Sequence, residues 1–420
     1  MKKLLILGGT SASVEVLKVA KSLGYYVVVA DDAPVEKRIA KQMADEAIAI
    51  STTDYEMLKE YIKSHNIDGV FCGPSEFNIS NAMEVCKRAG LPFYCTKEQW
   101  DICSNKYTFK RMCRENQVPC VEEYDIKDTK EKIKFPVIVK PVDGCSSKGI
   151  TVCEKESELE TAYNEALKYS ESKKVVVEKY IQNKGVGVSV RYIIENGNFH
   201  LSLMGDRYVT DPYGKKALTT NVVIYPSKYT EYYQKSIDQN VQKMFKKIGI
   251  QNGVLFMQAL PEDGEIYFHE MGLRLSGGLP YVITEAANGI NDVKMMLRYA
   301  VGEEMCTKYE IDHIDPYLNG KSAVLFSIPI RSGEIGKIEG IEAIKQMIPL
   351  IDYTQYYTQG DIIPNNYIGT TMQFFCRFKF FALNREDAAE KIELIQKVIQ
   401  IEDVNGKDMI YKYFDCSRIK

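Results

Sequence analysis

Short apolar runs alternate with segments of helical periodicity at the start of the chain. Residues 4–7 are apolar, residues 12–23 repeat apolar positions three and four apart, and residues 25–30 form a second apolar run. The same rhythm predicts strands over 47–50 and 69–72 and helices over 54–64 and 75–89. Because neighbouring parallel strands need long crossover connections, this alternation predicts a parallel sheet with flanking helices in a first domain over residues 1–95.

A second region continues the alternation with different connections. Its predicted elements are a helix over 105–116, a buried strand over 136–140, a small-residue loop over 143–149, a helix over 156–169 and a strand over 175–179. Strands over 186–194 and 199–203, a long helix over 229–248 and a hairpin of 253–260 with 265–271 follow. The hairpin turn, Pro261-Glu262-Asp263-Gly264, contains the residues that tight turns favour. We expect a second domain over residues 96–310, with a small lobe over residues 107–182.

Beyond residue 315 the pattern changes to strands and Gly/Pro turns, with one helix over 386–399. These residues predict a third, mixed α/β lobe over residues 311–420. The predicted fold class is therefore multidomain, α/β and α+β, with a parallel-sheet domain first.

Composition excludes several classes of protein. The 420 residues are 45% hydrophobic with a net charge of −3, which argues against a nucleic-acid partner. No apolar run reaches the roughly 18 residues of a membrane span, and the apolar run after Lys3 is too short for a signal peptide. The eleven cysteines are odd in number and contain no C-x-x-C pair, so we expect reduced thiols and no zinc site. We expect a cytoplasmic protein with no membrane partner.

The turn Gly8-Gly9-Thr10-Ser11 precedes a predicted helix and could favour an anion. A dinucleotide fold needs G-x-G-x-x-G with an acid about 20 residues later. Asp31 or Asp32 meets the second condition, but the glycine spacing fails the first. Small residues packing a strand–helix turn are the preferred interpretation, and a dinucleotide-dependent oxidoreductase remains an alternative.

Cationic and small residues follow the buried strand of the second region. Lys140 ends that strand and Lys106 begins the preceding helix, which makes both candidate phosphate-binding cations. The loop between Lys140 and the next strand offers backbone amides and side-chain hydroxyls through Gly144, Ser146, Ser147 and Gly149. Its spacing resembles a P-loop, but Ile150 stands where that motif needs lysine, which disfavours a Walker-type NTPase.

Further candidates close the neighbouring strands. Glu178, Lys179, Tyr180 and Ile181 end a strand where backbone groups could face a base edge. Gln258 and Glu270 lie on the two hairpin strands and are oxygen ligands suited to Mg²⁺. Arg274, four residues later, can clamp a phosphate or carboxylate. Arg191, Arg207 and Tyr208 could face an acid, although structural roles are preferred for them.

Taken in order, these residues resemble the ATP-grasp superfamily of carboxylate–amine ligases, in the branch with carbamoyl-phosphate-synthetase-like and L-amino-acid-ligase-like proteins. The matching segments are Asn105-Lys106, Val137 to Pro141, Asp143 to Ile150, Val177 to Ile181, and His269 to Gly278. The resemblance implies an ATP-grasp fold behind an N-terminal Rossmann-like domain. It implies that Lys106 and Lys140 contact the ATP phosphates under the Gly/Ser loop, that Glu178 through Ile181 hold adenine, and that Gln258 and Glu270 bind Mg²⁺ or Mn²⁺. Arg274 and Lys140 would be the catalytic residues.

The implied reaction activates a small-molecule carboxylate as an acyl phosphate and transfers it to an amine, with a homodimer as one assembly to consider. Two residues depart from the family pattern: Gly272 replaces a usual metal-binding Asn, and Gly187 replaces a usual acid after the hinge. An ATP-binding protein with lost or weak turnover is therefore a second alternative.

Overall fold

A parallel four-stranded sheet begins the chain. The computed structural model describes residues 1–125, 133–142, 149–209 and 219–419. The first sheet has the order β3-β2-β1-β4 and contains β1 (Lys3–Leu7), β2 (Tyr26–Ala30), β3 (Glu46–Ile48) and β4 (Gly69–Phe71). Its helices are α1 (Val14–Ser22), α2 (Ile39–Met43), α3 (Tyr55–His65) and α4 (Glu76–Ala89). All strand pairs in this sheet are parallel, which confirms the prediction from apolar periodicity.

The bounds of α4 follow from its end residues. The Ser75 hydroxyl accepts a hydrogen bond from the Asn78 N–H at 3.4 Å, so the helix begins at Glu76. Gly90 then adopts a φ of +74°, a conformation that glycine tolerates and other residues resist, so the helix ends at Ala89.

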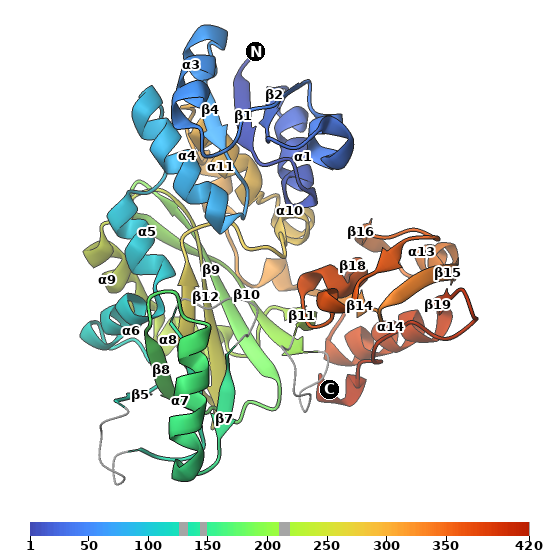
Figure 1. The fold of residues 1–420 in the computed structure, drawn as a ribbon. Helices are drawn as coiled ribbons and strands as arrows, with labels where there is room; N and C mark the ends of the chain where they lie inside the picture. The colour runs from blue at the N-terminus through green and yellow to red at the C-terminus, as the bar shows by residue number, and fades with distance from the viewer. Residues whose placement is uncertain (126–132, 143–148, 210–218, 420) are drawn as a thin grey trace.

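A small antiparallel sheet follows. It has the order β5-β8-β6-β7 and contains β5 (Glu123–Tyr124), β6 (Val137–Pro141), β7 (Thr151–Cys153) and β8 (Val175–Lys179). Helices α5 (Lys97–Ser104) and α6 (Lys106–Glu115) precede it, and α7 (Leu159–Lys168) packs against it (Figure 1). Helix α5 was not predicted; a capping box formed by Thr96 and Gln99 begins it.

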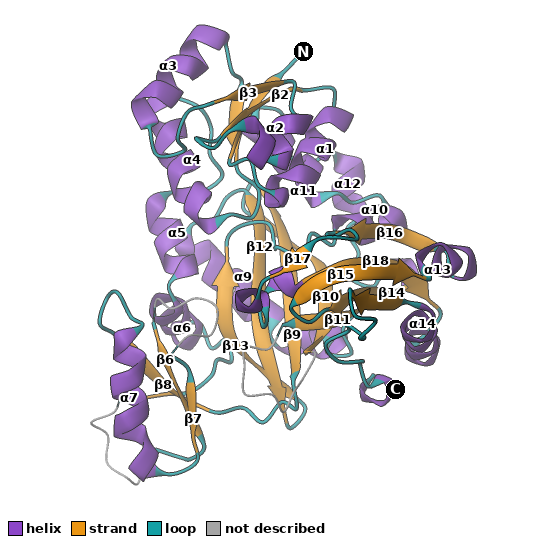
Figure 2. Cartoon of the chain, turned by 45° about the vertical axis from the view of Figure 1, so that its right-hand side comes forward, coloured by secondary structure: helices purple, strands orange, loops and turns teal. Residues whose placement is uncertain are grey.

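An eight-stranded antiparallel sheet forms the centre of the molecule. Its order is β13-β12-β9-β10-β11-β14-β18-β16. The strands are β9 (Val186–Glu195), β10 (Asn198–Val209), β11 (Thr220–Tyr225), β12 (Gly253–Glu262), β13 (Glu265–Gly272), β14 (Ser322–Pro329), β16 (Leu350–Gln355) and β18 (Phe374–Ala382). Because β11 pairs with β14, the C-terminal strands extend the sheet that carries the predicted hairpin (Figure 2).

The two faces of this sheet have different environments. Two residues that are paired across neighbouring antiparallel strands have their side chains on the same face of the sheet. On one face, Val222, Phe326 and Phe378 belong to the core formed with α14 (Arg385–Val398). The opposite face carries Gln258 and Glu270, and α10 (Tyr281–Asn288) packs on part of it through Ile283 and Ala287.

The remaining elements surround these sheets. They are α8 (Thr230–Ser236), α9 (Asp238–Ile248), α11 (Asp292–Ala300), α12 (Lys308–Asp312), α13 (Ile341–Met347), and a third sheet of β17 (Ile362–Ile363), β15 (Gly333–Glu339) and β19 (Gln400–Asp403). Short 3-10 turns span Ser11–Ser13, Val35–Lys37, Glu156–Glu158, Leu318–Gly320, Asn365–Tyr367, Thr371–Gln373 and Cys416–Arg418.

Two predictions about helices are wrong. The helix predicted over 229–248 is divided at Ile237, whose φ of −123° leaves the helical region while its side chain is buried. The C-terminal region holds α13 in addition to the helix predicted there.

Ten described cysteines form no disulfide, as predicted. In the ranges that the structure describes, no helix is long and apolar enough to cross a membrane.

Candidate functional site

A buried carboxylate holds two lysines at the edge of the small sheet. Glu178 on β8 is 1% exposed and forms ion pairs with Lys140 on β6 and with Lys110 on α6. The Lys110 Nζ also lies 3.2 Å from the Glu123 Oε1. Burial would raise the pKa of Glu178, but the charges of Lys140 and Lys110 outweigh burial and lower this pKa to about 2. Burial lowers the pKa of Lys140, and the Glu178 charge opposes that effect. Glu178 is therefore ionised and fixes both ammonium groups.

Lys106 begins α6 beside this cluster. The Asn105 Oδ1 accepts hydrogen bonds from the backbone N–H groups of Tyr107 at 3.0 Å and Thr108 at 3.1 Å, which caps the helix. The charge of Lys106 is among those that act on Lys140. The structure thus brings Lys106 near Lys140 and adds Lys110 to them.

Lys110 and Glu178 show what local sequence patterns missed. Glu178 was predicted to face adenine through its backbone, and the structure adds that its carboxylate contacts two lysines. Lys110 lies on the apolar stripe of α6 with Phe109 and Cys113, and all three side chains are buried. A lysine within an apolar stripe was the signal that could have identified it.

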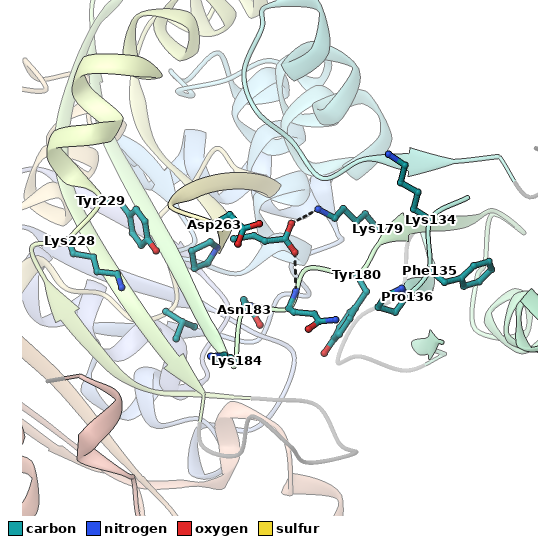
Figure 3. Close-up of a pocket in the computed structure, with 14 residues that line it drawn as sticks. Lys134, Phe135, Pro136, Lys179, Tyr180, Asn183, Lys184, Lys228, Tyr229 and Asp263 are labelled. Carbon is teal, nitrogen blue, oxygen red and sulfur yellow. Dashed lines mark hydrogen bonds and ion pairs between the residues drawn. The ribbon is translucent and has the colours of Figure 1, made fainter. Parts of the chain in front are cut away.

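The hinge beyond Glu178 borders a pocket of about 600 Å³. Lys134 and Phe135 lie on one side of it, and Lys228 and Tyr229 lie on the other (Figure 3). Two predicted hinge residues, Lys179 and Tyr180, line the pocket, while Ile181 is buried in the core. Lys179 forms an ion pair with Glu262, which connects the hinge to the hairpin of the large sheet.

The predicted metal ligands lie side by side on the large sheet. Gln258 on β12 pairs with Glu270 on β13, and both side chains are partly exposed. Arg207 on β10 donates a hydrogen bond to the Gln258 Oε1. Burial lowers the pKa of Arg207, and the nearby Glu270 carboxylate opposes that effect. Among the described residues, no group of three or more His, Cys, Asp or Glu side chains is arranged so that it could hold a metal ion. Two protein oxygens fit Mg²⁺, which usually keeps waters and takes substrate phosphates as further ligands.

The small sheet approaches this pair through His269. The Val121 N–H donates to the Phe268 carbonyl at 3.0 Å, which joins the segment before β5 to β13. Burial, together with the Lys140 charge, lowers the pKa of His269 to about 3. The imidazole is therefore neutral at pH 7 and adds no charge to the site.

Phe256 explains the glycine at position 272. The two residues are paired between β12 and β13, and a Cβ on Gly272 would lie 2.5 Å from the Phe256 ring. The Arg274 guanidinium stacks over the same ring at 4.8 Å. An asparagine at position 272 would collide with Phe256, so this chain lacks that metal-binding amide for a steric reason. Gly187 differs, because its nearest neighbours would be in ordinary contact with a Cβ.

Arg274 connects the site to the first sheet. Its Nη2 lies 2.7 Å from the Glu76 Oε1 on α4, and its Nη1 donates to the Leu275 carbonyl at 3.0 Å. Glu76 is a partner that the sequence did not reveal. Among the other candidates, Arg191 pairs with Asp292, and the Tyr208 hydroxyl accepts a hydrogen bond from Arg385 at 3.0 Å on the opposite face. Of the three candidates Arg191, Arg207 and Tyr208, only Arg207 lies beside Gln258 and Glu270.

The predicted Gly/Ser loop is largely outside the described residues, including Gly144, Ser146 and Ser147. Gly149 is described, with a φ of +70° and with the Tyr169 ring 2.8 Å from where its Cβ would be. Glycine is needed at position 149 because of this backbone conformation and because the Tyr169 ring leaves no room for a side chain.

Asp31 does not have the role that a dinucleotide site requires. Its Oδ2 accepts a hydrogen bond from the Gly9 N–H at 2.9 Å, and its Oδ1 lies 2.9 Å from the Arg38 Nε. The carboxylate therefore stabilises the turn after β1 instead of facing a ribose. The oxidoreductase alternative is not supported.

Comparisons with known proteins show what this chain is similar to. Residues 105–273 match the family described as the D-ala D-ala ligase C-terminus. The small subunit of 2-oxoglutarate carboxylase from Hydrogenobacter thermophilus is 27% identical over 336 residues, which cover 72% of this chain and 67% of that protein. A formate-dependent phosphoribosylglycinamide formyltransferase from Prochlorococcus marinus is 29% identical over 191 residues, 43% of this chain and 48% of the relative. The chain thus spans about half the length of that second relative.

The fold has solved counterparts over nearly the whole chain. A crystal structure of L-amino acid ligase from Bacillus licheniformis superimposes with a TM-score of 0.76 and 20% identity, and covers 96% of this chain and 99% of that one. At this identity the likeness establishes the architecture, including the sheets that carry the lysine cluster and the Gln258–Glu270 pair.

Proposed function

We propose that this chain is a member of the ATP-grasp superfamily and an ATP- and Mg²⁺-dependent ligase that joins a small-molecule carboxylate to an amine. In this reaction a carboxylate oxygen attacks the γ-phosphorus of ATP and ADP leaves. The amine nitrogen then attacks the acyl carbon of the acyl phosphate, phosphate leaves, and the nitrogen loses a proton. Mn²⁺ is expected to replace Mg²⁺ because both accept oxygen ligands.

One observation carries the proposal. Glu178 fixes Lys140 and Lys110 on the small sheet, and the large sheet places the oxygen donors Gln258 and Glu270 close by, next to His269. A triphosphate and a carboxylate repel each other strongly when poorly screened, so clustered cations are what their reaction needs.

Each residue has a role that follows from its place. Lys106 and Lys140 bind phosphate oxygens, and Lys110 acts through Glu178 to position Lys140. Residues Glu178 through Ile181 present the hinge backbone to the base. A divalent ion on Gln258 and Glu270 would neutralise phosphate charge. Arg274, stacked on Phe256 and paired with Glu76, would act at the γ-phosphate.

The test is a phosphate-release screen with ATP, Mg²⁺ and a matrix of carboxylic acids and amines. The proposal expects release of phosphate and ADP that depends on both an acid and an amine. ATP binding without ADP release in any combination would favour the alternative, a nucleotide-binding protein that has lost turnover. That alternative draws on Gly272 and Gly187, which stand where the family has polar ligands.

Replacing Glu270 with glutamine is expected to raise the Mg²⁺ concentration needed for half-maximal activity about tenfold, because the site loses its charged ligand. The measurement is ATP turnover as a function of Mg²⁺. The matched control is Glu265→Gln, an exposed glutamate at the start of the same strand. An unchanged Mg²⁺ dependence in Glu270→Gln would remove this residue from the metal site.

A further inference from the structure

The pocket of about 600 Å³ beside the hinge contains none of the residues assigned to the ATP phosphates or to the metal (Figure 3). We call it the hinge pocket. Its walls come from the segment before β6, the linker between β8 and β9, the segment before α8, and the turn of the hairpin. The hinge pocket is therefore built from both the small sheet and the large sheet. The assigned residues that are absent from its walls are Lys106, Lys140, Gln258, Glu270 and Arg274.

One wall of the hinge pocket lies on the face of the large sheet opposite the predicted metal ligands. Arg207, which contacts one of those ligands, is paired with Gly187. The lining residue Val186 precedes Gly187 on β9, so its side chain lies on the other face. Lys228 is fixed on that face too, because its backbone N–H donates to the Asp206 carboxylate at 3.2 Å and Asp206 precedes Arg207 on β10. The large sheet thus separates this wall from the metal ligands.

The hinge reaches the pocket from the corresponding face of the small sheet. Glu178 contacts Lys140 and Lys110 on one face. Lys179 is the next residue on β8, so its side chain lies on the other face, where it pairs with Glu262. In both sheets, therefore, lining residues of the hinge pocket belong to the face that carries neither the lysine cluster nor the predicted metal ligands.

Lysines give the hinge pocket its charge. Among the described residues, four lysines and two acids line it, which leaves two positive charges. The pair of Lys179 with Glu262 neutralises one lysine. The other three lysines form no ion pair within the part of the chain that the structure describes. Like charges that converge from separate segments repel one another, so an anion in the pocket would stabilise this arrangement. The four lysines are Lys134, Lys179, Lys184 and Lys228.

Lys184 has a backbone conformation that lysine disfavours. Its φ of +50° lies in the left-handed region, which glycine and asparagine tolerate better. The linker around it is fixed, since the Arg418 guanidinium donates to the carbonyls of Lys184 at 3.3 Å and Gly185 at 3.2 Å. The Asn183 Oδ1 also accepts a hydrogen bond from the Gly185 N–H at 3.1 Å. Backbone strain of this kind gathers at ligand-binding sites, and here it places an ammonium group at the pocket.

The lining of the hinge pocket favours phosphate groups over carboxylates. A lysine ammonium group is a compact point charge that binds phosphate, whereas planar carboxylates are matched by the fork of arginine. No described arginine lines the pocket. Lys134 lies on one side and Lys228 on the other, with Lys184 of the linker as a third cation (Figure 3). Two phosphate groups on one small molecule would match this arrangement, and the volume suits such a ligand.

We propose that the hinge pocket binds a small molecule that carries two phosphate groups, at a site separate from ATP. This ligand bridges Lys134 on the side of the small sheet and Lys228 on the side of the large sheet, and it contacts Lys184 between them. Because the linker joins the two sheets, the bound ligand holds them in one relative position. The inference goes beyond the proposed ligase reaction and does not depend on turnover.

The first test is calorimetric titration with fructose 1,6-bisphosphate and with 2,3-bisphosphoglycerate, at saturating MgADP so that the nucleotide site is occupied. We expect one molecule of at least one bisphosphate to bind per chain, at least tenfold more tightly than fructose 6-phosphate or citrate. Absence of binding by both bisphosphates, equal binding of citrate, or competition between the bisphosphate and MgADP would overturn the proposal.

The second test uses variants of exposed lysines, which are expected to fold. Lys134→Met and Lys228→Met are each expected to weaken binding of the preferred bisphosphate about tenfold, with MgADP affinity unchanged, because each removes a charged contact to phosphate. Lys184→Asn, which suits the left-handed backbone, is expected to weaken binding without loss of stability. The matched controls are Lys155→Met and Lys243→Met, exposed lysines outside the pocket.

The variants also test whether the ligand bridges the two sheets. A loss of affinity in Lys134→Met alone or in Lys228→Met alone would overturn the bridge. Bisphosphate affinity equal to that of the controls in both variants would overturn the site.

Discussion

Replacing Lys140 with methionine is expected to weaken ATP binding about 30- to 150-fold, because a charged contact to phosphate contributes about 2–3 kcal/mol. The structure makes this variant informative. Lys140 ends β6 and is held by Glu178, so its ammonium group occupies one position before nucleotide arrives. In the variant, Glu178 keeps its ion pair with Lys110, and the fold is expected to survive. Calorimetric titration with MgATP measures the loss.

Lys168→Met is the matched control for this experiment. Lys168 is an exposed residue on α7, which packs on the same small sheet, and it pairs with Glu165 at its own helix end. We expect it to bind ATP as the wild type does. Equal ATP affinity in Lys140→Met and Lys168→Met would remove Lys140 from the phosphate site.

Replacing Glu178 with glutamine is expected to destabilise the protein by about 3–5 kcal/mol, because it leaves a buried charge without its partner. The side chain of Lys110 is fully buried, and the remaining acid near it, Glu123, already pairs with Arg114 at 2.8 Å. Denaturant unfolding monitored by circular dichroism measures the change. Adding Lys110→Met to Glu178→Gln is expected to restore part of the stability. A double variant with a lower free energy of unfolding than Glu178→Gln alone would contradict the charge argument.

The same carboxylate predicts a pH dependence. The pKa of Glu178 is lowered from 4.5 to about 2 in the folded protein, so its ionised form is favoured by folding. This contribution, about 3 kcal/mol, is complete above pH 4.5 and is lost as the pH falls from 4.5 towards 2. The difference in stability between the wild type and Glu178→Gln should shrink across that window. A difference that stays constant from pH 6 to pH 3 would show that Glu178 is not held ionised by its lysines.

Local patterns were sufficient for much of the fold and for part of the site. The strand–helix alternation predicted the parallel sheet, and a Gly-containing turn between apolar runs predicted the hairpin that carries Gln258 and Glu270. Lys106 and Lys140 could be selected because a helix start and a buried strand end limit where a side chain points. The predictions of the parallel sheet and the hairpin are confirmed, because periodicity and turn chemistry act within a few residues.

The partners of these residues depended on the tertiary structure. Lys110 stands within the apolar stripe of its helix, but only its pairing with Glu178, 68 residues away, makes it part of the site. Glu76 and Arg274 are 198 residues apart, and Phe256 determines the glycine at position 272 from the facing strand.

By itself, the sequence determined the order of the elements, their apolar faces and the residues that could carry phosphate chemistry, since these depend on local propensity and spacing. Only the tertiary structure decided that β11 pairs with β14, which unites the C-terminal strands with the hairpin in one sheet and brings Arg377 onto the face of Glu270. The physical reason is that strand pairing between distant segments is set by the total burial and hydrogen bonding of the whole sheet, and no single window of sequence contains that sum.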